Sequence, residues 1–399
     1  MLMNIRHENE LLLYCIRNTM EAGRAPEMKA LVERGIDWNY LIKKASQHGV
    51  IPQLYKSLND SCPEAVPTEA FDQLRHSFHT NTGRNLFLTT ELLKLLDLFT
   101  AHEIPAFPFK GPVLDAYLNQ DVISRQYEDL DIMVRTQDVT RAQELLLSQG
   151  YQPRIRLTSS QHVLFLRSEY ELPFVRKDSK CMVELHWKIT PKYFSYPLDP
   201  EHLCERLESV SLNGREVLTL SSEDLVLFLC MHGARHCWER LSWISDVATL
   251  ISTHSEMDWV WVMKQAHRLG SARMLYLGIF LTNDLLATHL PEQVSKRVYA
   301  DPMVKKLAAQ VRNRFFQENG RKTRVLEDCF FHLKVRDRLR DKIRYCIYQT
   351  TNPSILDWLL IPLPSSLSFL HHIARPIRLC GKYGLSLAKR LLLRAHSSI

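Results

Sequence analysis

Two aspartates one residue apart lie in an otherwise apolar run of the sequence. Asp129 and Asp131 stand in the segment 129–134, whose other residues are all apolar. The side chains of a strand alternate between its two faces, so a strand here presents both aspartates on one face and Glu128 on the other. Two carboxylates side by side repel each other, and burying them beside an apolar sheet is costly unless a cation neutralises them. The segment therefore predicts a strand with a divalent-cation site, for which all-oxygen ligands favour Mg²⁺, with Mn²⁺ as the alternative.

A third carboxylate, Glu184, lies in a second, largely apolar run at 182–189. With Asp129 and Asp131 it completes a predicted triad of metal ligands. His186 follows two residues later and therefore shares the face of Glu184. Two interpretations of His186 remain open: it orients the carboxylate or contacts a phosphate, or it is a partly buried structural histidine.

The pair Lys110-Gly111 lies between a predicted strand at 103–109 and a predicted helix at 112–118. The helix begins with Pro112, and proline suits the first position of a helix. Glycine lets the backbone approach a phosphate closely, the N–H groups at the start of a helix point outward, and lysine adds positive charge. Lys110 and Gly111 are therefore predicted to bind phosphate groups of a ligand.

The pattern of apolar residues divides the chain into helical and mixed regions. Helices are predicted over 10–22, 28–34, 38–48, 68–79, 85–102 and 137–149, and helical spacing returns from 222 onward. Strands are predicted over 103–109, 129–135, 163–166, 169–176 and 182–189, with a small hairpin centred on Asn213-Gly214. The predicted class is α+β and mostly helical, with a small mixed sheet. We predict four regions: an N-terminal helical region (1–84), an α/β core (85–195), a C-terminal helical domain (196–350), and an apolar, then basic, C-terminal segment (351–399).

Length and composition describe a globular protein of two or three structural units. The chain has 399 residues, of which 45% are hydrophobic and 24% are charged. No segment supplies the roughly 20 continuous apolar residues of a membrane-spanning helix, and residues 1–17 carry charges before any apolar run, unlike a secretory signal. The nine cysteines include no Cys-x-x-Cys pair, which favours reduced thiols. We therefore expect a cytoplasmic protein.

Positive charge is concentrated near the C-terminal end. The net charge is +7, and residues 371–399 contain no acid but six basic residues: Arg375, Arg378, Lys382, Lys389, Arg390 and Arg394. This basic end has two interpretations. It makes a weak contact with an acidic membrane surface or a polyanion, or it is the end of a helix in solvent. The basic run 321–344 has acids at intrahelical pairing distance and lacks an RNA-binding signature, so no specific nucleic acid partner is expected.

The order of these features resembles a known superfamily. The chain resembles the polymerase-beta-like nucleotidyltransferases, and specifically their bacterial family of uncharacterised nucleotidyltransferases. The likeness is in the order of a strand, a Lys-Gly turn, a helix, a strand with Asp-x-Asp and a later strand with Glu. The residues that carry the likeness are Phe109-Lys110-Gly111, Arg125, 128–134, Glu184-Leu185-His186-Trp187, His232, 238–241, Trp243 and Asp246. The resemblance covers most of the chain and implies a polymerase-beta-like α/β core flanked by helical regions.

The resemblance also implies a reaction. In that superfamily the glycine turn holds the nucleotide phosphates, the Asp-x-Asp pair binds divalent metal ions, and the third acid helps to activate the acceptor. Here Lys110 and Gly111 would contact the triphosphate of an NTP such as ATP. Asp129 and Asp131 would ligate Mg²⁺ or Mn²⁺, and Glu184 would complete the second metal site or take the acceptor proton. A nucleoside monophosphate would pass to an unidentified acceptor, which is a hydroxyl or phosphate of a small molecule, glycan, peptide or protein.

Arg125 and His232 are further candidates for nucleotide binding. Arg125 lies in the loop four residues before the first aspartate, where a cation is suited to stabilise a leaving group. A solvent-facing loop arginine is the equally weighted alternative. His232 lies on a predicted helix where it forms a polar stripe with Arg235 and His236. The stripe is predicted to face the nucleotide cleft, with Asp246 holding one of its cations, and incidental polar residues on a packed helix are the alternative.

The sequence departs from the superfamily pattern at two positions. Gly or Ser usually follows the turn glycine, and Pro112 offers neither an N–H group nor a hydroxyl to a phosphate. The third acid is usually aspartate, and Glu184 is longer by one methylene. A non-catalytic nucleotide-binding protein with a regulatory or scaffold role therefore stays as the alternative to an enzyme.

Overall fold

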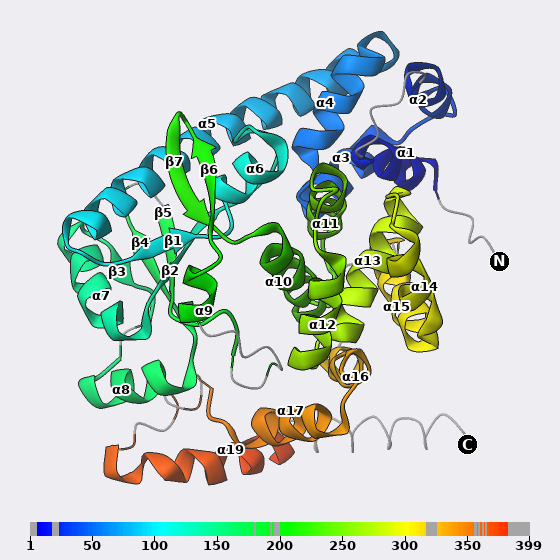
Figure 1. The fold of residues 1–399 in the computed structure, drawn as a ribbon. Coiled ribbons are helices and arrows are strands. Elements are labelled where there is room, and N and C mark those ends of the chain that lie inside the picture. Colours follow the sequence, from blue (N-terminus) through cyan, green and yellow to red (C-terminus); the bar gives the residue numbers. More distant parts are fainter. Residues whose placement is uncertain are drawn as a thin grey trace.

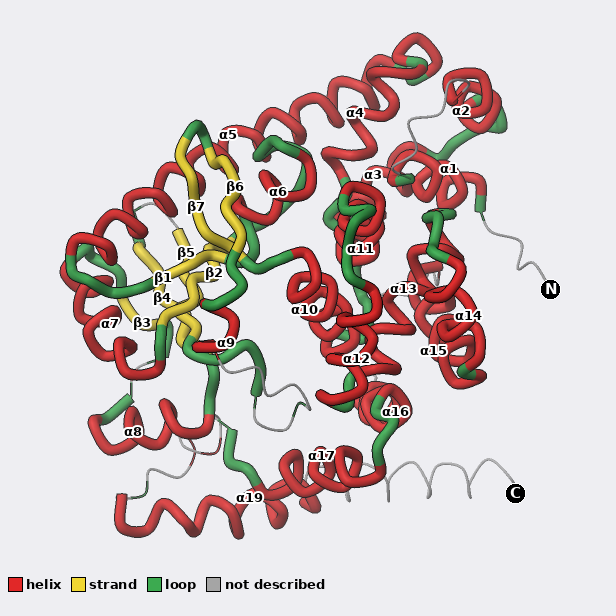
Figure 2. The backbone as a smooth tube through the Cα atoms, in the orientation of Figure 1, coloured by secondary structure: helices red, strands yellow, loops and turns green. Residues whose placement is uncertain are grey.

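The computed structural model describes most of the chain. Its described residues are 6–17, 24–155, 157–178, 181–191, 194, 200–316, 325–354, 357, 360, 363 and 365–381. Helices surround one five-stranded sheet and one two-stranded hairpin (Figure 2). The predicted class, mostly helical α+β with a small mixed sheet, is confirmed. Within the described residues, no helix has both the length and the apolar character to span a membrane.

The sheet has the strand order β1-β2-β5-β4-β3. Its strands are β1 (Ala106–Pro108), β2 (Asp129–Val134), β3 (Gln152–Pro153), β4 (Glu171–Arg176) and β5 (Cys181–His186). Strands β2 and β5 run parallel, and the other neighbours run antiparallel. Four of the predicted strands correspond to β1, β2, β4 and β5, and the pairing of β4 with β5 is the antiparallel extension that the alternating pattern indicated.

Apolar side chains cover the face of the sheet that lies opposite the aspartates. Leu130, Ile132 and Leu185 are fully buried, in a core shared with helices α5 (Thr68–Ala101) and α7 (Val139–Ser148). Figure 1 shows α5 running along the outside of the sheet toward the N-terminal helices. The other face of β2 and β5 is therefore the one that can carry polar side chains.

Helix α5 is continuous over residues 68–101, where two helices had been predicted at 68–79 and 85–102. The residues between these two predictions contain no proline and one glycine, Gly83. A single glycine costs a helix only about 1 kcal/mol relative to alanine, and packing of the flanking turns outweighs that cost. The predicted boundary after residue 84 falls inside this helix.

One predicted strand is wrong. Residues 163–166 lie in helix α8 (Ser159–Ser168). The backbone N–H of Gln161 donates to the side chain of Thr158, and the N–H of Thr158 donates to the side chain of Gln161. This reciprocal capping box satisfies two N–H groups that a helix start leaves unpaired. It stabilises a helix in a segment whose short apolar alternation also suits a strand.

Two sets of helices share one hydrophobic core. The first set is α1 (His7–Ile16), α2 (Arg24–Val32), α3 (Trp38–His48) and α4 (Ile51–Ser61). The second is α10 (Ser222–Arg235), α11 (Leu241–Thr253), α12 (Trp259–Leu269), α13 (Ala272–Leu286), α14 (Glu292–Ala300), α15 (Pro302–Phe316) and α16 (Val325–Val335). Leu11, Leu54 and Leu277 are fully buried in this common core. The regions before and after the sheet therefore pack together, although the sheet separates them in sequence.

Shorter elements complete the described chain. They are η1 (Pro63–Ala65), α6 (Pro112–Asn119), η2 (Thr136–Asp138), α9 (Pro200–Cys204), β6 (Glu208–Leu212), β7 (Arg215–Thr219), α17 (Leu339–Thr351), η3 (Ser365–Leu370) and α19 (His371–Leu379). Strands β6 and β7 form the hairpin predicted at Asn213-Gly214. All nine cysteines are free thiols, as expected.

Two basic residues of the C-terminal segment have a structural partner. Asp357 is 3% exposed and binds Arg375 at 2.7 Å and Arg378 at 2.6 Å. These ion pairs lower the pKa of Asp357 well below its usual range, although burial raises it. Two of the six positive charges are thus neutralised within the fold. The other four, from Lys382 onward, lie outside the described residues, so contact with a membrane surface or polyanion stays a prediction.

Two glycines in helices give opposite predictions for stability. A Cβ on Gly233 of α10 would lie 2.5 Å from the ring of Trp238, which is fully buried. We expect Gly233→Ala to lower the free energy of unfolding by about 1–3 kcal/mol, because the core must shift to admit the methyl group. Gly83→Ala in α5 meets no atom within 4 Å and should raise it by up to about 1 kcal/mol.

Urea denaturation of the two variants and the wild type measures this difference. Both changes add the same methyl group to a helix, so helix propensity is matched and only the surroundings differ. A neutral or stabilising Gly233→Ala would contradict the close packing of α10 on Trp238.

Candidate active site

The register of β2 and β5 places the predicted acids side by side. Asp131 pairs with Glu184 across the two parallel strands, and Asp129 pairs with Met182. The ligand atoms of Asp131, Glu184 and His186 all lie within 4.8 Å of one another. The sequence left open whether His186 orients the carboxylate, contacts a phosphate or is structural, and the structure places its ring nitrogen among the atoms close enough to share a metal ion.

Asp131 is the most buried of the three predicted acids, at 1% exposure, and it is held by two cations. The Nζ atom of Lys110 lies 2.5 Å from its Oδ1, and Nε2 of His186 lies 3.0 Å from the same oxygen. Although burial raises the pKa of Asp131, these two neighbours hold it well below its usual range. The second oxygen, Oδ2, is buried and has no hydrogen-bond partner among the described residues. One oxygen is thus used by the protein and the other is available to a ligand.

Asp129 lies beside this cluster at the start of β2. Burial and the negative charge of Asp131 raise the pKa of Asp129 to about 7. Its carboxyl group also interacts electrostatically with Lys110, Glu184 and His186, so it belongs to the same charged group. It is not among the atoms within 4.8 Å of one another, and its role as a metal ligand stays a prediction.

His186 lies between carboxylates on both of its nitrogens. Its Nε2 faces Asp131, and its Nδ1 is 3.4 Å from Oε2 of Glu171, the residue opposite it on β4. Burial lowers the pKa of His186, but its hydrogen bonds to Asp131 and Glu184 raise it to about 9. The imidazole is therefore a cation at neutral pH when no metal competes for it. The sequence did not indicate Glu171 as a site residue, because only the pairing of β4 with β5 brings it next to His186.

The turn after β1 requires a glycine. Gly111 has φ +62° and ψ −132°, a combination that side chains disfavour. A Cβ there would lie 3.1 Å from the backbone oxygen of Asp129. The glycine therefore lets the turn approach the first aspartate closely. Lys110 points to Asp131, and the nearby carboxylates raise its pKa above the ordinary value, although burial opposes this.

Arg125 fastens the same turn to the helical part of the protein. Its guanidinium donates to both oxygens of Asp246 on α11, at 2.6 and 2.7 Å, and to the backbone oxygen of Gly111 at 3.4 Å. Its side chain is 12% exposed, so the alternative of a solvent-facing loop arginine is wrong. Asp246 holds a cation, as expected, but that cation is Arg125 and not a residue of the α10 stripe. Contact of Arg125 with a triphosphate stays a prediction.

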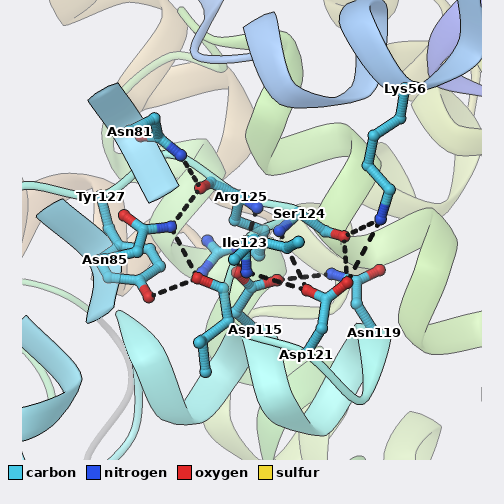
Figure 3. A network of polar contacts seen from close by, with 11 residues as sticks. Lys56, Asn81, Asn85, Asp115, Asn119, Asp121, Ile123, Ser124, Arg125 and Tyr127 are labelled. Carbon is cyan, nitrogen blue, oxygen red and sulfur yellow. Dashed lines mark hydrogen bonds and ion pairs between the residues drawn. The ribbon is translucent and has the colours of Figure 1, made fainter. Parts of the chain in front are cut away.

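The loop that carries Arg125 is held on several sides (Figure 3). Asn85 of α5 donates to the backbone oxygens of Val122 and Arg125, at 2.8 and 2.9 Å. The backbone N–H of Arg125 donates to Asp115 of α6 at 3.1 Å. Burial raises the pKa of Asp115 to about 7. Lys56 of α4 adds a hydrogen bond to Ser124 at 2.8 Å, so three helices, α4, α5 and α6, hold the loop before Asp129.

Helix α10 contributes His232 and Arg235 near the acidic face of the sheet. The ring of His232 contacts Phe228 at 5.8 Å and Trp243 at 5.2 Å between centroids. Burial and the charge of Lys110 lower the pKa of His232 well below its usual value, so the imidazole is neutral. Arg235 binds the hydroxyl of Tyr170 and stacks on its ring at 4.7 Å. The polar stripe thus adjoins the site, and binding of a nucleotide by His232 stays a prediction.

Comparison with known families identifies the class of protein. A family model described as uncharacterised nucleotidyltransferase matches residues 34–287. The chain belongs to this family. The match includes every predicted site residue from Lys110 to His232, and it confirms the predicted enzyme class, nucleotidyltransferase. The chain matches no curated protein.

Several solved structures are similar to parts of this nucleotidyltransferase. The lincosamide antibiotic adenylyltransferase LnuA with bound lincomycin has 16% identity, covers 35% of this chain and 84% of its own, and has a TM-score of 0.27. ANT(2'')-Ia in complex with adenylyl-2''-tobramycin has 14% identity, covers 45% of this chain and 97% of its own, and has a TM-score of 0.33. An antigenic nucleotidyltransferase-like protein from Paracoccidioides brasiliensis has 15% identity, covers 54% of this chain and 97% of its own, and has a TM-score of 0.31.

The ion pair of Arg125 and Asp246 gives a test of how the site is anchored. Asp246→Leu removes the ion-pair partner of a largely buried guanidinium, and we expect a loss of about 3–5 kcal/mol in the free energy of unfolding. The double variant Arg125→Met, Asp246→Leu removes both charges and should lose clearly less than the sum of the single variants. A double-mutant cycle from denaturant unfolding measures this coupling. Additive losses would show that the two residues do not support each other.

Proposed function

We propose that this protein is a metal-dependent nucleotidyltransferase that moves a nucleoside monophosphate from an NTP to an acceptor hydroxyl or phosphate. The observation that carries the proposal is the buried, unpartnered Oδ2 of Asp131, within a group of two carboxylates and one imidazole. A buried carboxylate oxygen without a partner is costly, and a ligand that binds it removes the cost. Membership of the nucleotidyltransferase family supports the reaction class.

The residues fit a divalent cation. Asp131 and Glu184 supply hard oxygen atoms from neighbouring strands, Asp129 lies beside them, and such ligands suit Mg²⁺ or Mn²⁺. A bound divalent cation neutralises charge on the phosphate oxygens and on the leaving group. Lys110 and His186 bind the other oxygen of Asp131, so they fix the direction of Oδ2 without occupying it.

The remaining residues prepare the displacement at the α-phosphate. Gly111 lets a triphosphate approach the backbone beside Asp129, and Lys110 adds positive charge there. The acceptor oxygen forms a bond to the α-phosphorus, the bond from that phosphorus to the bridging oxygen breaks, and pyrophosphate leaves. The proton of an acceptor hydroxyl passes to the carboxylate of Glu184, whose side chain is 23% exposed and therefore accessible.

One observation favours a second candidate function, nucleotide binding without turnover. Helix α6 begins with Pro112, so the position after Gly111 has no N–H group for a phosphate. Incubation of the protein with each labelled NTP, Mg²⁺ and a cell extract separates the two functions. Label transferred to an acceptor together with released pyrophosphate supports the transferase. NTP binding without pyrophosphate release across the extract and a broad acceptor panel supports the binding protein.

Replacement of one carboxylate tests the metal site directly. Asp131→Asn removes the charge of the carboxylate whose Oδ2 is unpartnered, and we expect Mn²⁺ affinity to fall by at least about tenfold, or about 1.4 kcal/mol. Electron paramagnetic resonance of free Mn²⁺ measures binding without any substrate. Glu128→Gln is the matched control, because this exposed residue directly precedes β2 and alternation of the chain directs it away from the cluster. Equal affinities for the wild type and Asp131→Asn would exclude Asp131 as a ligand.

A further inference from the structure

A large cavity lies beside the candidate active site. Its volume is about 1120 Å³, slightly above the range of roughly 300–1,000 Å³ that is usual for small-molecule sites. Helices α3 and α5 form one side, through residues such as Asn39 and Thr80. The loop at 126–128 and strands β4 and β5 form the other side, through Tyr127, Val175 and Met182. The cavity thus lies between the N-terminal helices and the end of the sheet.

The floor of this cavity continues the acidic face of the sheet. Met182 is the register partner of Asp129, and it lies two residues before Glu184 on the same strand. Side chains two residues apart share a face, so Met182 lies on the face of Glu184. Val175 pairs with Met182 across β4 and β5 and extends this face further from β2. The cavity therefore continues the face of the sheet that carries the carboxylates, and its lining reaches the residues next to Asp129 in the chain and across the strands.

The cavity and the Lys110-Gly111 turn lie on opposite flanks of β2. The turn follows β1, which pairs with one edge of β2. The cavity residues Val175 and Met182 come from β4 and β5, on the other edge. In an in-line displacement, the attacking oxygen and the leaving group lie on opposite sides of the phosphorus. If pyrophosphate leaves toward the turn, the acceptor approaches from the flank that holds the cavity.

The lining of the cavity is basic. It contains four arginine or lysine side chains, Lys43, Arg84, Arg154 and Lys177, against one carboxylate, Glu128. Lys43, Arg154 and Lys177 are exposed and form no ion pair with any residue that the structure describes. They come from α3, from the residue after β3 and from the residue after β4, three separate segments that converge on one space. Such an arrangement attracts an anion, since its charges are not spent on the protein itself.

We infer that this cavity is the acceptor site, and that the acceptor is a small molecule carrying phosphate or carboxylate groups. The inference rests on the proposed nucleotidyl transfer. The anionic groups bind Lys43, Arg154 and Lys177, and the attacking oxygen of the molecule points along the face of Met182 toward Glu184. Binding of the anion needs neither metal nor nucleotide, because none of the three cations belongs to the metal cluster.

Calorimetric titration of the metal-free protein with three probes tests the inference. Glucose 1-phosphate presents a phosphate, citrate presents carboxylates, and glucose is the neutral control. We expect one or both anions to bind and glucose not to bind. The triple variant Lys43→Gln, Arg154→Gln, Lys177→Gln should weaken anion binding by at least about tenfold. The control variant Lys264→Gln, Arg268→Gln, Lys306→Gln removes the same charge from exposed positions outside the cavity and should bind as the wild type does.

Each other outcome overturns the inference. Absence of anion binding to the wild type excludes an anionic acceptor, and equal weakening by both triple variants shows a general charge effect. Loss of Mn²⁺-ATP binding in the cavity variant would assign the cavity to the donor. Thermal unfolding of each variant verifies that it is folded, and Lys177→Gln alone serves if the triple variant is not. The two proposals fail separately. Absence of label transfer in the incubation with labelled NTP refutes the proposed function. Absence of anion binding in the titration, which contains no NTP, refutes only the proposed class of acceptor.

Discussion

Burial of the Asp131 carboxylate is the constraint on which the site depends. A carboxylate at 1% exposure is stable only if cations or hydrogen bonds replace its water. Lys110 and His186 provide this at one oxygen, and they come from the turn after β1 and the end of β5. The ion pairs therefore fix three segments of the sheet relative to one another, and they leave the second oxygen of Asp131 without a partner among the described residues.

A second buried ion pair connects the site to the helical part of the protein. Arg125 joins Asp246 of α11 to the backbone oxygen of Gly111, so it connects the Lys110-Gly111 turn to the helix. The helices on both sides of the sheet in sequence share one core, which gives α11 a rigid support. The site thus lies where the sheet meets the helices. In the ion pair between them, Arg125 comes from the loop before β2 and Asp246 comes from α11.

The sequence allowed prediction of those features that depend on local pattern. Alternation placed Asp129 and Asp131 on one face and Glu184 with His186 on one face of a second strand, and the pairing of β2 with β5 then brings Asp131, Glu184 and His186 together. Contacts between distant segments were not predictable in the same way. Arg125 and Asp246 are 121 residues apart, and nothing in the loop indicates where the guanidinium points. The strand predicted at 163–166 failed for a local reason, because a capping box at Thr158 competes with a short alternating pattern.

Pro112 leaves the turn after β1 with one N–H group fewer than a glycine or serine at this position would give. Any attraction of the turn for an anion therefore depends more strongly on charged side chains. Lys110 is already bound to Asp131, and Arg125 is bound to Asp246, so both cations are partly neutralised. The cations of this region that are not paired within the described residues, Lys43, Arg154 and Lys177, line the cavity on the other flank of β2. An anion is therefore attracted more strongly to the cavity than to the turn until a metal ion adds its charge to the carboxylates.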